Sequence, residues 1–209
     1  MKNILCYGDS NTWGYVPGAG ARFSLDRRWP GILQQSLGNT FHIIEAGLNG
    51  RTTVFDDPAN TGCNGLTSLG PLLESCPLLD MVILMLGTND VKYHLGVHAR
   101  ETAKGIERLV EIIEAHSASA TRDAPQILIV SPPGIHAGSL MSGPLFRGAL
   151  EKLRELPQLF AEVADKKGCH FLDAAQFVNP SPVDGVHLDE QGHLRLAQMI
   201  AHTLTEASG

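Results

Sequence analysis

The sequence predicts an α/β fold, a three-layer α/β/α sandwich with a parallel sheet of five strands. Three observations favour this class. Five short apolar runs recur along the 209 residues, and continuous apolar character is typical of strands buried on both faces of a sheet. Segments with apolar residues at helical spacing lie between most of these runs. Strands that alternate with helices imply a parallel sheet with right-handed crossovers.

The first predicted strand begins almost at the N-terminus and stops at Gly8. The clearest strand is DMVILML, at Asp80–Leu86, which we expect to lie centrally because it is apolar throughout after Asp80. In chain order, the predicted strands are Asn3–Tyr7, Phe41–Glu45, Asp80–Leu86, Gln126–Val130 and Cys169–Leu172.

Four segments have helical periodicity. In the first, Pro30 suits a first turn and Gly38 provides a stop. In the third, Pro157 is expected to kink or split the helix, because proline lacks a backbone N–H and clashes with the preceding turn. The predicted helices are Trp29–Leu37, Ala99–Ala115, Arg147–Lys167 and Glu190–Thr205.

Three stretches are predicted to be loops. Pro17–Arg28 is rich in glycine and charge and is expected to run irregularly over the surface. Arg51–Gly70 is rich in Asn, Asp, Thr and Gly, and should lie over a site because it begins at the end of a strand. Ile135–Phe146 contains Gly, Ser, Met and Pro, and is expected to be mobile or to contact another subunit.

Size and composition predict a single domain that spans residues 1–209. Hydrophobic residues make up 43% of the chain and charged residues 18%, which is not a signature of disorder. The net charge of -6 argues against nucleic-acid binding, which requires a basic patch. No apolar stretch approaches the ~20 residues of a membrane helix, and the N-terminal run is too short for a signal peptide. We therefore expect a cytoplasmic protein with no membrane partner, whose four cysteines stay reduced because they show neither C-x-x-C nor zinc-ligand spacing.

A short polar segment, Asp9-Ser10-Asn11-Thr12, follows the first strand. In open α/β sheets, ligands bind outside the carboxyl ends of the strands, so a hydroxyl residue just past the first strand is well placed for chemistry. Ser10 is therefore the candidate nucleophile. The alternative is a turn in which Gly8 and Asp9 only bend the chain into a helix.

A serine hydroxyl requires a base, and nine histidines are available. His187 stands out because Asp184 lies three residues earlier, where its carboxylate can hold the far ring nitrogen and stabilise an imidazolium. The alternatives are that Asp184 caps a helix, or that the pair are two metal ligands. Because catalytic zinc usually has three protein ligands and no third has matching spacing, we expect no metal. Four other histidines have no acid partner by spacing: His94, His98, His136 and His193.

Four blocks in order along the whole chain resemble the SGNH hydrolase superfamily, the GDSL-type esterases and lipases. The four residues that name the superfamily are here Ser10, Gly47, Asn89 and His187. One departure is Asn11, where the commoner form has leucine. Three further segments look most like the branch of bacterial aryl esterases and acyltransferases: Thr12–Tyr15, Gly50–Thr53 and Asp56–Pro58.

The resemblance implies a flavodoxin-like SGNH fold and a serine esterase that acts on short-chain esters, including aryl esters, through an acyl-enzyme. Its oxyanion hole would consist of the backbone N–H groups of Ser10 and Gly47 and the amide of Asn89. The residues alone leave Gly47 open as a turn glycine and Asn89 as a helix cap. The resemblance also implies acyl transfer to water, alcohols or peroxide, no cofactor, and assembly as a homo-oligomer.

Five residues are predicted to contact the small-molecule ester. Asp9 and Asn11 flank the nucleophile, and three apolar side chains are expected to form part of a pocket, although each suits the core equally. These three are Trp13, Val54 and Ile135, with Tyr15 and Phe55 as further candidates.

Two other functions remain open from the sequence. A thioesterase, lysophospholipase or carbohydrate acetylesterase would use the same triad. A flavodoxin-like domain that binds phosphate without catalysis would leave Asp184, His187 and Asn89 without a role, and the chain has neither G-x-x-x-x-G-K-[ST] nor G-x-G-x-x-G.

Overall fold

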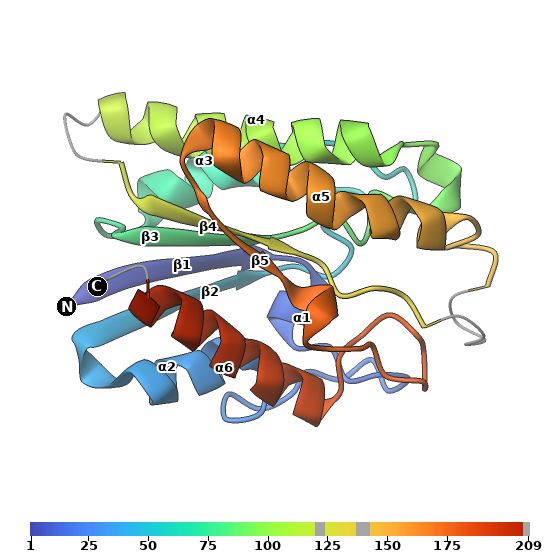
Figure 1. The fold of residues 1–209 in the computed structure, drawn as a ribbon, viewed down its shortest axis with the longest axis horizontal. Coiled ribbons are helices and arrows are strands. Elements are labelled where there is room, and N and C mark those ends of the chain that lie inside the picture. The colour runs from blue at the N-terminus through green and yellow to red at the C-terminus, as the bar shows by residue number, and fades with distance from the viewer. Residues whose placement is uncertain (120–123, 137–142, 207–209) are drawn as a thin grey trace.

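The computed structural model describes residues 1–119, 124–136 and 143–206 of the chain, and its five strands form one sheet (Figure 1). The strands lie in the order β2-β1-β3-β4-β5, and every neighbouring pair is parallel. The five predicted strands are confirmed to within two residues at each end. Their bounds are β1 Lys2–Gly8, β2 Phe41–Gly47, β3 Met81–Met85, β4 Gln126–Ser131 and β5 His170–Asp173.

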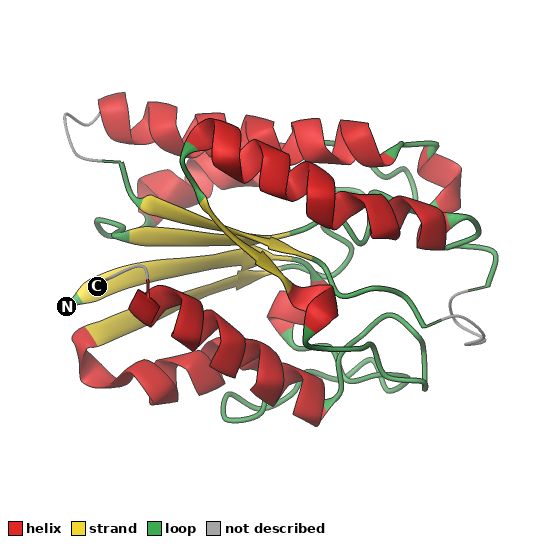
Figure 2. Cartoon of the chain, in the orientation of Figure 1, coloured by secondary structure: helices red, strands yellow, loops and turns green. Residues whose placement is uncertain are grey.

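Helices cover both faces of the sheet, so the predicted three-layer sandwich is confirmed (Figures 1 and 2). One layer consists of α3 (Gly65–Ser75), α4 (Ala99–Ser119) and α5 (Ala149–Lys167). The other consists of α2 (Trp29–Leu37) and α6 (Glu190–Glu206). A one-turn helix, α1 (Ser10–Trp13), follows β1 directly.

Alternate side chains of the central strands enter two separate cores, because successive residues of a strand point to opposite faces. In β1, Leu5 and Tyr7 pack toward the layer of α3, α4 and α5. Ile4 and Cys6 pack toward α2 and α6, where Trp29 is completely buried. Each fully buried large apolar side chain contributes about 1.5–3 kcal/mol, so both faces of β1 are anchored.

The helix α3 was not predicted, because residues Arg51–Gly70 were expected to be loop. Its N-terminus is capped by Asn64, whose side chain accepts a hydrogen bond from the backbone N–H two residues further on. Leu69 and Leu73 bury one face of the helix against the core. The glycines and Pro71 of this segment have low intrinsic helix propensity, and packing overrides it.

The other helices follow their predictions closely, with two differences. The helix α4 ends at Ser119, four residues beyond its predicted end at Ala115. The helix α5 continues through Pro157 as a single element and is not split. The predicted loop Ile135–Phe146 lies partly outside the described residues, since 137–142 are not described. Pro17–Arg28 is irregular, as predicted, and its Arg22 forms an isolated bridge with Tyr15.

None of the described helices is both long and apolar enough to cross a membrane. All four cysteines are free thiols in the structure, as predicted.

The carboxyl end of β1 is tightly enclosed. A side chain at Gly8 would overlap Thr12 of α1 and approach the carbonyl oxygen of Met85 in β3 to within 2.8 Å. Only glycine therefore lets the chain turn from β1 into α1 at this point, and this turn places Ser10 at the carboxyl edge of the sheet.

Candidate active site

Ser10 is the first residue of α1. The helix is capped by Asp9, whose carboxylate accepts a hydrogen bond from the backbone N–H of Asn11 at 2.9 Å. The helix ends at Gly14, which has a left-handed conformation with φ of 89°. The first N–H groups of a helix have no carbonyl partner within it, so the backbone N–H of Ser10 is available to a ligand.

The structure brings Ser10, His187 and Asp184 into one hydrogen-bonded line. The Oγ of Ser10 lies 2.9 Å from Nε2 of His187, and Nδ1 of the same ring lies 2.8 Å from Oδ2 of Asp184. Oδ1 of Asp184 accepts hydrogen bonds from the backbone N–H groups of Val186 and His187, both at 3.0 Å. A carboxylate on Nδ1 places the remaining imidazole lone pair on Nε2, facing the serine hydroxyl.

The carboxyl group of Asp184 is held in its ionised form. Burial raises its pKa, but the hydrogen bonds from the side chain and backbone of His187 and from the backbone of Val186 outweigh this effect and lower the pKa to about 2. The backbone N–H of Gly18 also lies 3.3 Å from Oδ2, so the predicted surface loop Pro17–Arg28 reaches the site.

Asn11 connects α1 to the segment that carries His187. Its Nδ2 donates to the carbonyl of Val186 at 3.3 Å, and its Oδ1 accepts from the N–H of Leu188 at 2.9 Å. A leucine cannot make these two bonds, so asparagine at this position fixes the base relative to the nucleophile. Tyr15 stacks on the imidazole of His187, with ring centroids 4.1 Å apart and an interplanar angle of 27°.

Asn89 lies just after β3 and is held by the backbone that follows β2. Its Nδ2 donates to the carbonyl oxygen of Arg51 at 3.0 Å, which leaves the second N–H of the amide without a partner among the described residues. Arg51 is itself buried, donates to the carbonyl oxygens of Gly8 and Ala46, and lies over the ring of Tyr7. The orientation of the Asn89 amide is therefore set by its hydrogen bond to Arg51, a residue that is itself held by buried contacts.

Gly47 is not among the residues that line the cavity of about 320 Å³ beside Ser10. Gly47 is the last residue of β2, and a side chain there would overlap the backbone of Trp13. Gly50, three residues further along, lines that cavity and has a φ of 80°. Its backbone N–H has no acceptor among the residues that the structure describes.

A cavity of about 320 Å³ lies beside Ser10 and His187, within the size range of small-molecule sites. Both polar and apolar side chains line this cavity. The lining residues are Ser10, Tyr15, Asn49, Gly50, Asn60, Asn89, Lys92, Leu145, Phe146, Asp184, Val186 and His187.

None of the five predicted substrate contacts lines this cavity, and the structure gives each another place. Asp9 caps α1, and Asn11 binds the backbone near His187. The ring of Trp13 contacts Arg22 and Tyr15 instead. Val54 and Ile135 pack in the core on the α4 side of the sheet.

Sequence reasoning missed seven lining residues, and it overlooked one ion pair. The missed residues are Asn49, Gly50, Asn60, Lys92, Leu145, Phe146 and Val186. The prediction that His94 has no acid partner is wrong, because its Nε2 lies 2.8 Å from Oδ1 of Asp57. The two residues are 37 positions apart, so spacing gave no signal.

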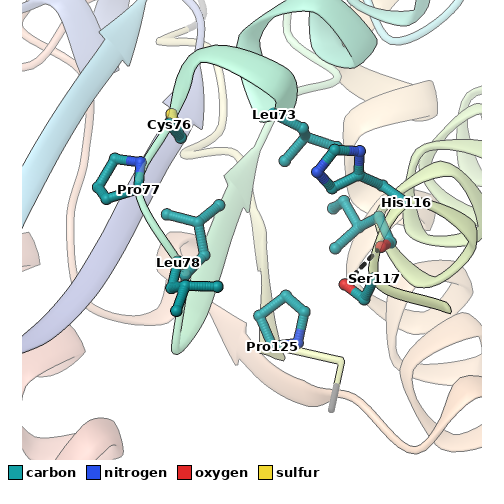
Figure 3. A pocket seen from close by; sticks show the side chains of 9 residues that line it. Leu73, Cys76, Pro77, Leu78, His116, Ser117 and Pro125 are labelled. Atoms are coloured by element: carbon teal, nitrogen blue, oxygen red, sulfur yellow. Dashed lines mark hydrogen bonds between the residues drawn. The ribbon is translucent and has the colours of Figure 1, made fainter. Parts of the chain in front are cut away.

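A second cavity lies at the other end of the strands, near the amino ends of β3 and β4 (Figure 3). It holds only about 40 Å³, lined mainly by apolar side chains such as Leu73, Leu78 and Pro125. It is too small for an ester substrate. Within the described ranges, no group of three or more His, Cys, Asp or Glu residues is placed to hold a metal ion.

A model of the GDSL-like Lipase/Acylhydrolase family matches residues 6–195 of the chain. The chain belongs to this family. The resemblance to GDSL-type enzymes that the four sequence blocks indicate is thereby confirmed, and the chain is a carboxylic ester hydrolase of the GDSL type.

Two kinds of enzyme are named among the solved structures that are similar to the chain. The native aryl esterase of M. smegmatis has 37% sequence identity over 99% of both chains, with a TM-score of 0.93. The carbohydrate acetylesterase Est24 of Sinorhizobium meliloti has 34% identity over 99% of this chain and 100% of its own, with a TM-score of 0.94. A carbohydrate acetylesterase family member from the same organism has 38% identity over 99% of this chain and 98% of its own, with a TM-score of 0.92. No significant match is found among curated proteins.

Proposed function

We propose that this GDSL-type enzyme is a serine esterase that cleaves short-chain carboxylic esters, including aryl esters, through an acyl-enzyme on Ser10. The observation that carries the proposal is the line of two hydrogen bonds from Ser10 through His187 to Asp184, at the edge of a cavity of about 320 Å³. Similarity to an aryl esterase over 99% of both chains supports the substrate class.

The reaction proceeds in two steps. The Oγ of Ser10 attacks the ester carbonyl carbon while its proton passes to Nε2 of His187. The tetrahedral intermediate then expels the alcohol, which takes that proton from the imidazolium, and leaves the acyl group on Ser10. Water attacks the acyl-enzyme with His187 again as the base, and the acid product leaves.

The negative oxygen of the tetrahedral intermediate needs donors that are already in place. We assign this role to the backbone N–H groups of Ser10 and Gly50 and to the free amide N–H of Asn89. Gly50 takes the place predicted for Gly47, because it lines the cavity and its N–H has no acceptor among the described residues. The close packing of Gly47 against Trp13 accounts for a glycine there without a role in the reaction.

Alcohols or peroxide can replace water in the second step, which would make the enzyme an acyltransferase as well. The apolar side chains of Phe146 and Val186, which line the cavity with Ser10, support this extension, because apolar walls offer water no hydrogen-bond partner beside the acyl-enzyme.

Acetylated carbohydrates are the second candidate substrates. Two carbohydrate acetylesterases are similar to the chain at 34% and 38% identity, and Asn49 and Asn60, whose side chains can hydrogen-bond hydroxyl groups, line the cavity. Comparing kcat/KM for an acetylated sugar and for 4-nitrophenyl acetate distinguishes the two classes.

Turnover of 4-nitrophenyl acetate as a function of pH tests the proposed function. We expect kcat/KM to fall toward the acid side between pH 8 and pH 5, because an imidazolium at His187 cannot accept the proton of Ser10. Asp184, with a pKa of about 2, stays ionised over this range and adds no second proton to the fall. A flat profile contradicts the role of His187.

Asp90, which follows Asn89 directly, is a second group expected to change its charge between pH 8 and pH 5, and it needs a control. Burial raises the pKa of Asp90 to about 6, and its carboxylate accepts hydrogen bonds from the backbone and hydroxyl of Thr53. In the variant Asp90→Asn, the acid-side fall is expected to persist. Its disappearance would assign the titration to Asp90 and not to the base.

Asn89→Ala is expected to reduce kcat by about 10²–10³-fold with a small effect on KM, because the amide acts on charge that develops in the transition state. Steady-state kinetics on 4-nitrophenyl acetate measures both constants. The melting temperature serves as the control, since the bond to the carbonyl of Arg51 is lost as well. A change confined to KM would place Asn89 in ground-state binding instead.

A further inference from the structure

Lys92 is a nearly buried cation that the proposed mechanism does not use. It follows β3 by seven residues and is 4% exposed. It also lines the same cavity as Ser10 and His187. Among the described residues that line this cavity, Lys92 is the only lysine or arginine.

The carboxylate partner of Lys92 is already saturated with donors. Oδ2 of Asp57 lies 3.0 Å from Nζ of Lys92 and 2.9 Å from Nδ2 of Asn60. Oδ1 lies 2.9 Å from the N–H of Ala59 and 2.8 Å from Nε2 of His94. A carboxylate offers about four lone-pair sites, so Asp57 has no room for a second N–H of the same ammonium.

Asp57 also stays charged. Its side chain is fully buried, which raises its pKa, but the hydrogen bonds from His94, Asn60, Lys92 and Ala59 outweigh burial and hold the pKa far below its usual range. The carboxylate therefore keeps Lys92 in place, while its own charge is shared among four donors.

The ammonium of Lys92 has three N–H donors, and the structure gives only one of them an acceptor among the described residues. A cationic donor that is shielded from water forms its strongest hydrogen bonds with an anionic oxygen. The carboxylate of Asp184, which also lines the cavity, is already bound to His187 and to backbone N–H groups. Two N–H donors of Lys92 therefore have no acceptor among the described residues and are available to a ligand in the cavity.

We propose that Lys92 forms an anion subsite in the catalytic cavity and selects esters that carry a carboxylate on the acyl group or on the leaving alcohol. This inference rests on the proposed esterase function of Ser10. Asp57 is the positioning residue of the subsite, and Lys92 is the group that contacts the substrate.

Two matched pairs of esters test the subsite. The first pair is 4-acetoxybenzoate, which carries a carboxylate on the leaving group, and its neutral methyl ester. The second pair is phenyl hydrogen succinate, which carries a carboxylate on the acyl group, and the neutral phenyl methyl succinate. For each pair, the ratio of kcat/KM for the anion to that for the neutral ester is measured in the wild type and in variants. Comparing ratios between enzymes cancels the intrinsic reactivity of the esters.

The test variant is Lys92→Met combined with Asp57→Asn, because removing Lys92 alone would leave a buried carboxylate without its cation. The ratio is expected to fall at least fivefold for one of the pairs, as about one charge-assisted hydrogen bond is lost. The matched control is Lys104→Met, an exposed lysine on α4, which should leave both ratios unchanged. A smaller fall for both pairs in the double variant overturns the subsite.

A measurement on the wild type decides the matter if the double variant does not fold. Benzoate should inhibit the turnover of 4-nitrophenyl acetate competitively and at least fivefold more strongly than benzamide, which has the same shape without the charge. Equal inhibition by the two overturns the subsite while esterase activity stands. Absence of turnover with every ester overturns the esterase proposal, and the substrate subsite with it.

Discussion

Ser10→Ala is expected to lower kcat for 4-nitrophenyl acetate by about 10⁴-fold or more. In the wild type, Oγ of Ser10 lies 2.9 Å from Nε2 of His187. Without this hydroxyl, His187 has no serine to activate and no acyl-enzyme forms. Steady-state kinetics at pH 8 measures the loss. Any residual rate reflects water activated by His187 in the presence of the oxyanion donors.

The control for this variant is Ser36→Ala. Ser36 is an exposed serine on α2, and its hydroxyl donates only to the carbonyl of Ile32. It should retain wild-type kcat, and both variants should melt as the wild type does. A Ser10→Ala enzyme that keeps more than a tenth of the wild-type kcat would contradict the role of Ser10.

Asp184→Asn is expected to lower kcat by about 10⁴-fold. Oδ1 of Asp184 accepts two backbone N–H groups, so the amide oxygen of an asparagine takes this position and its NH₂ group faces Nδ1 of His187. The imidazole must then accept at Nδ1 and carry its proton on Nε2. In that tautomer it cannot take the proton of Ser10.

Kinetics between pH 7 and 9 tests this expectation, with the melting temperature to confirm that the loop still folds. The backbone N–H of Gly18, 3.3 Å from Oδ2, would also lose its acceptor, so a small loss of stability is expected in addition. A loss of less than tenfold in kcat would show that Asp184 does not set the tautomer of His187.

The sheet could be predicted because the strands of a buried parallel sheet are apolar on both faces. The runs at Asn3–Tyr7 and Asp80–Leu86 differ from β1 and β3 by only one residue at each end. The helix α3 escaped prediction because Asn64 and the burial of Leu69 and Leu73 stabilise a segment whose glycines and Pro71 favour a loop.

The grouping of Ser10, Asp184 and His187 could also be predicted from the sequence, since each residue lies in a recognisable short motif beside a predicted strand or helix. The cavity beside them could not. Its lining depends on contacts between distant segments, such as the ion pair between Lys92 and Asp57, 35 positions apart. Local spacing carries no information about such pairs.

Two assignments changed because chemically similar residues lie close together in the sequence. Gly47 and Gly50 are three residues apart, and only the packing of Trp13 against Gly47 distinguishes a glycine required by the fold from one that faces the cavity. Asn11 lies beside the nucleophile, but both ends of its amide bind the backbone of the segment that carries His187. Proximity in sequence did not indicate contact with substrate.

In the proposed reaction Ser10 is the nucleophile, and intact-mass analysis after treatment with a serine-directed organophosphonate tests this role. We expect one adduct per chain, located on Ser10 by peptide mapping, formed in parallel with the loss of 4-nitrophenyl acetate turnover, and absent from Ser10→Ala. An adduct that persists in Ser10→Ala, or a folded protein that neither forms an adduct nor turns over the ester, would contradict this role.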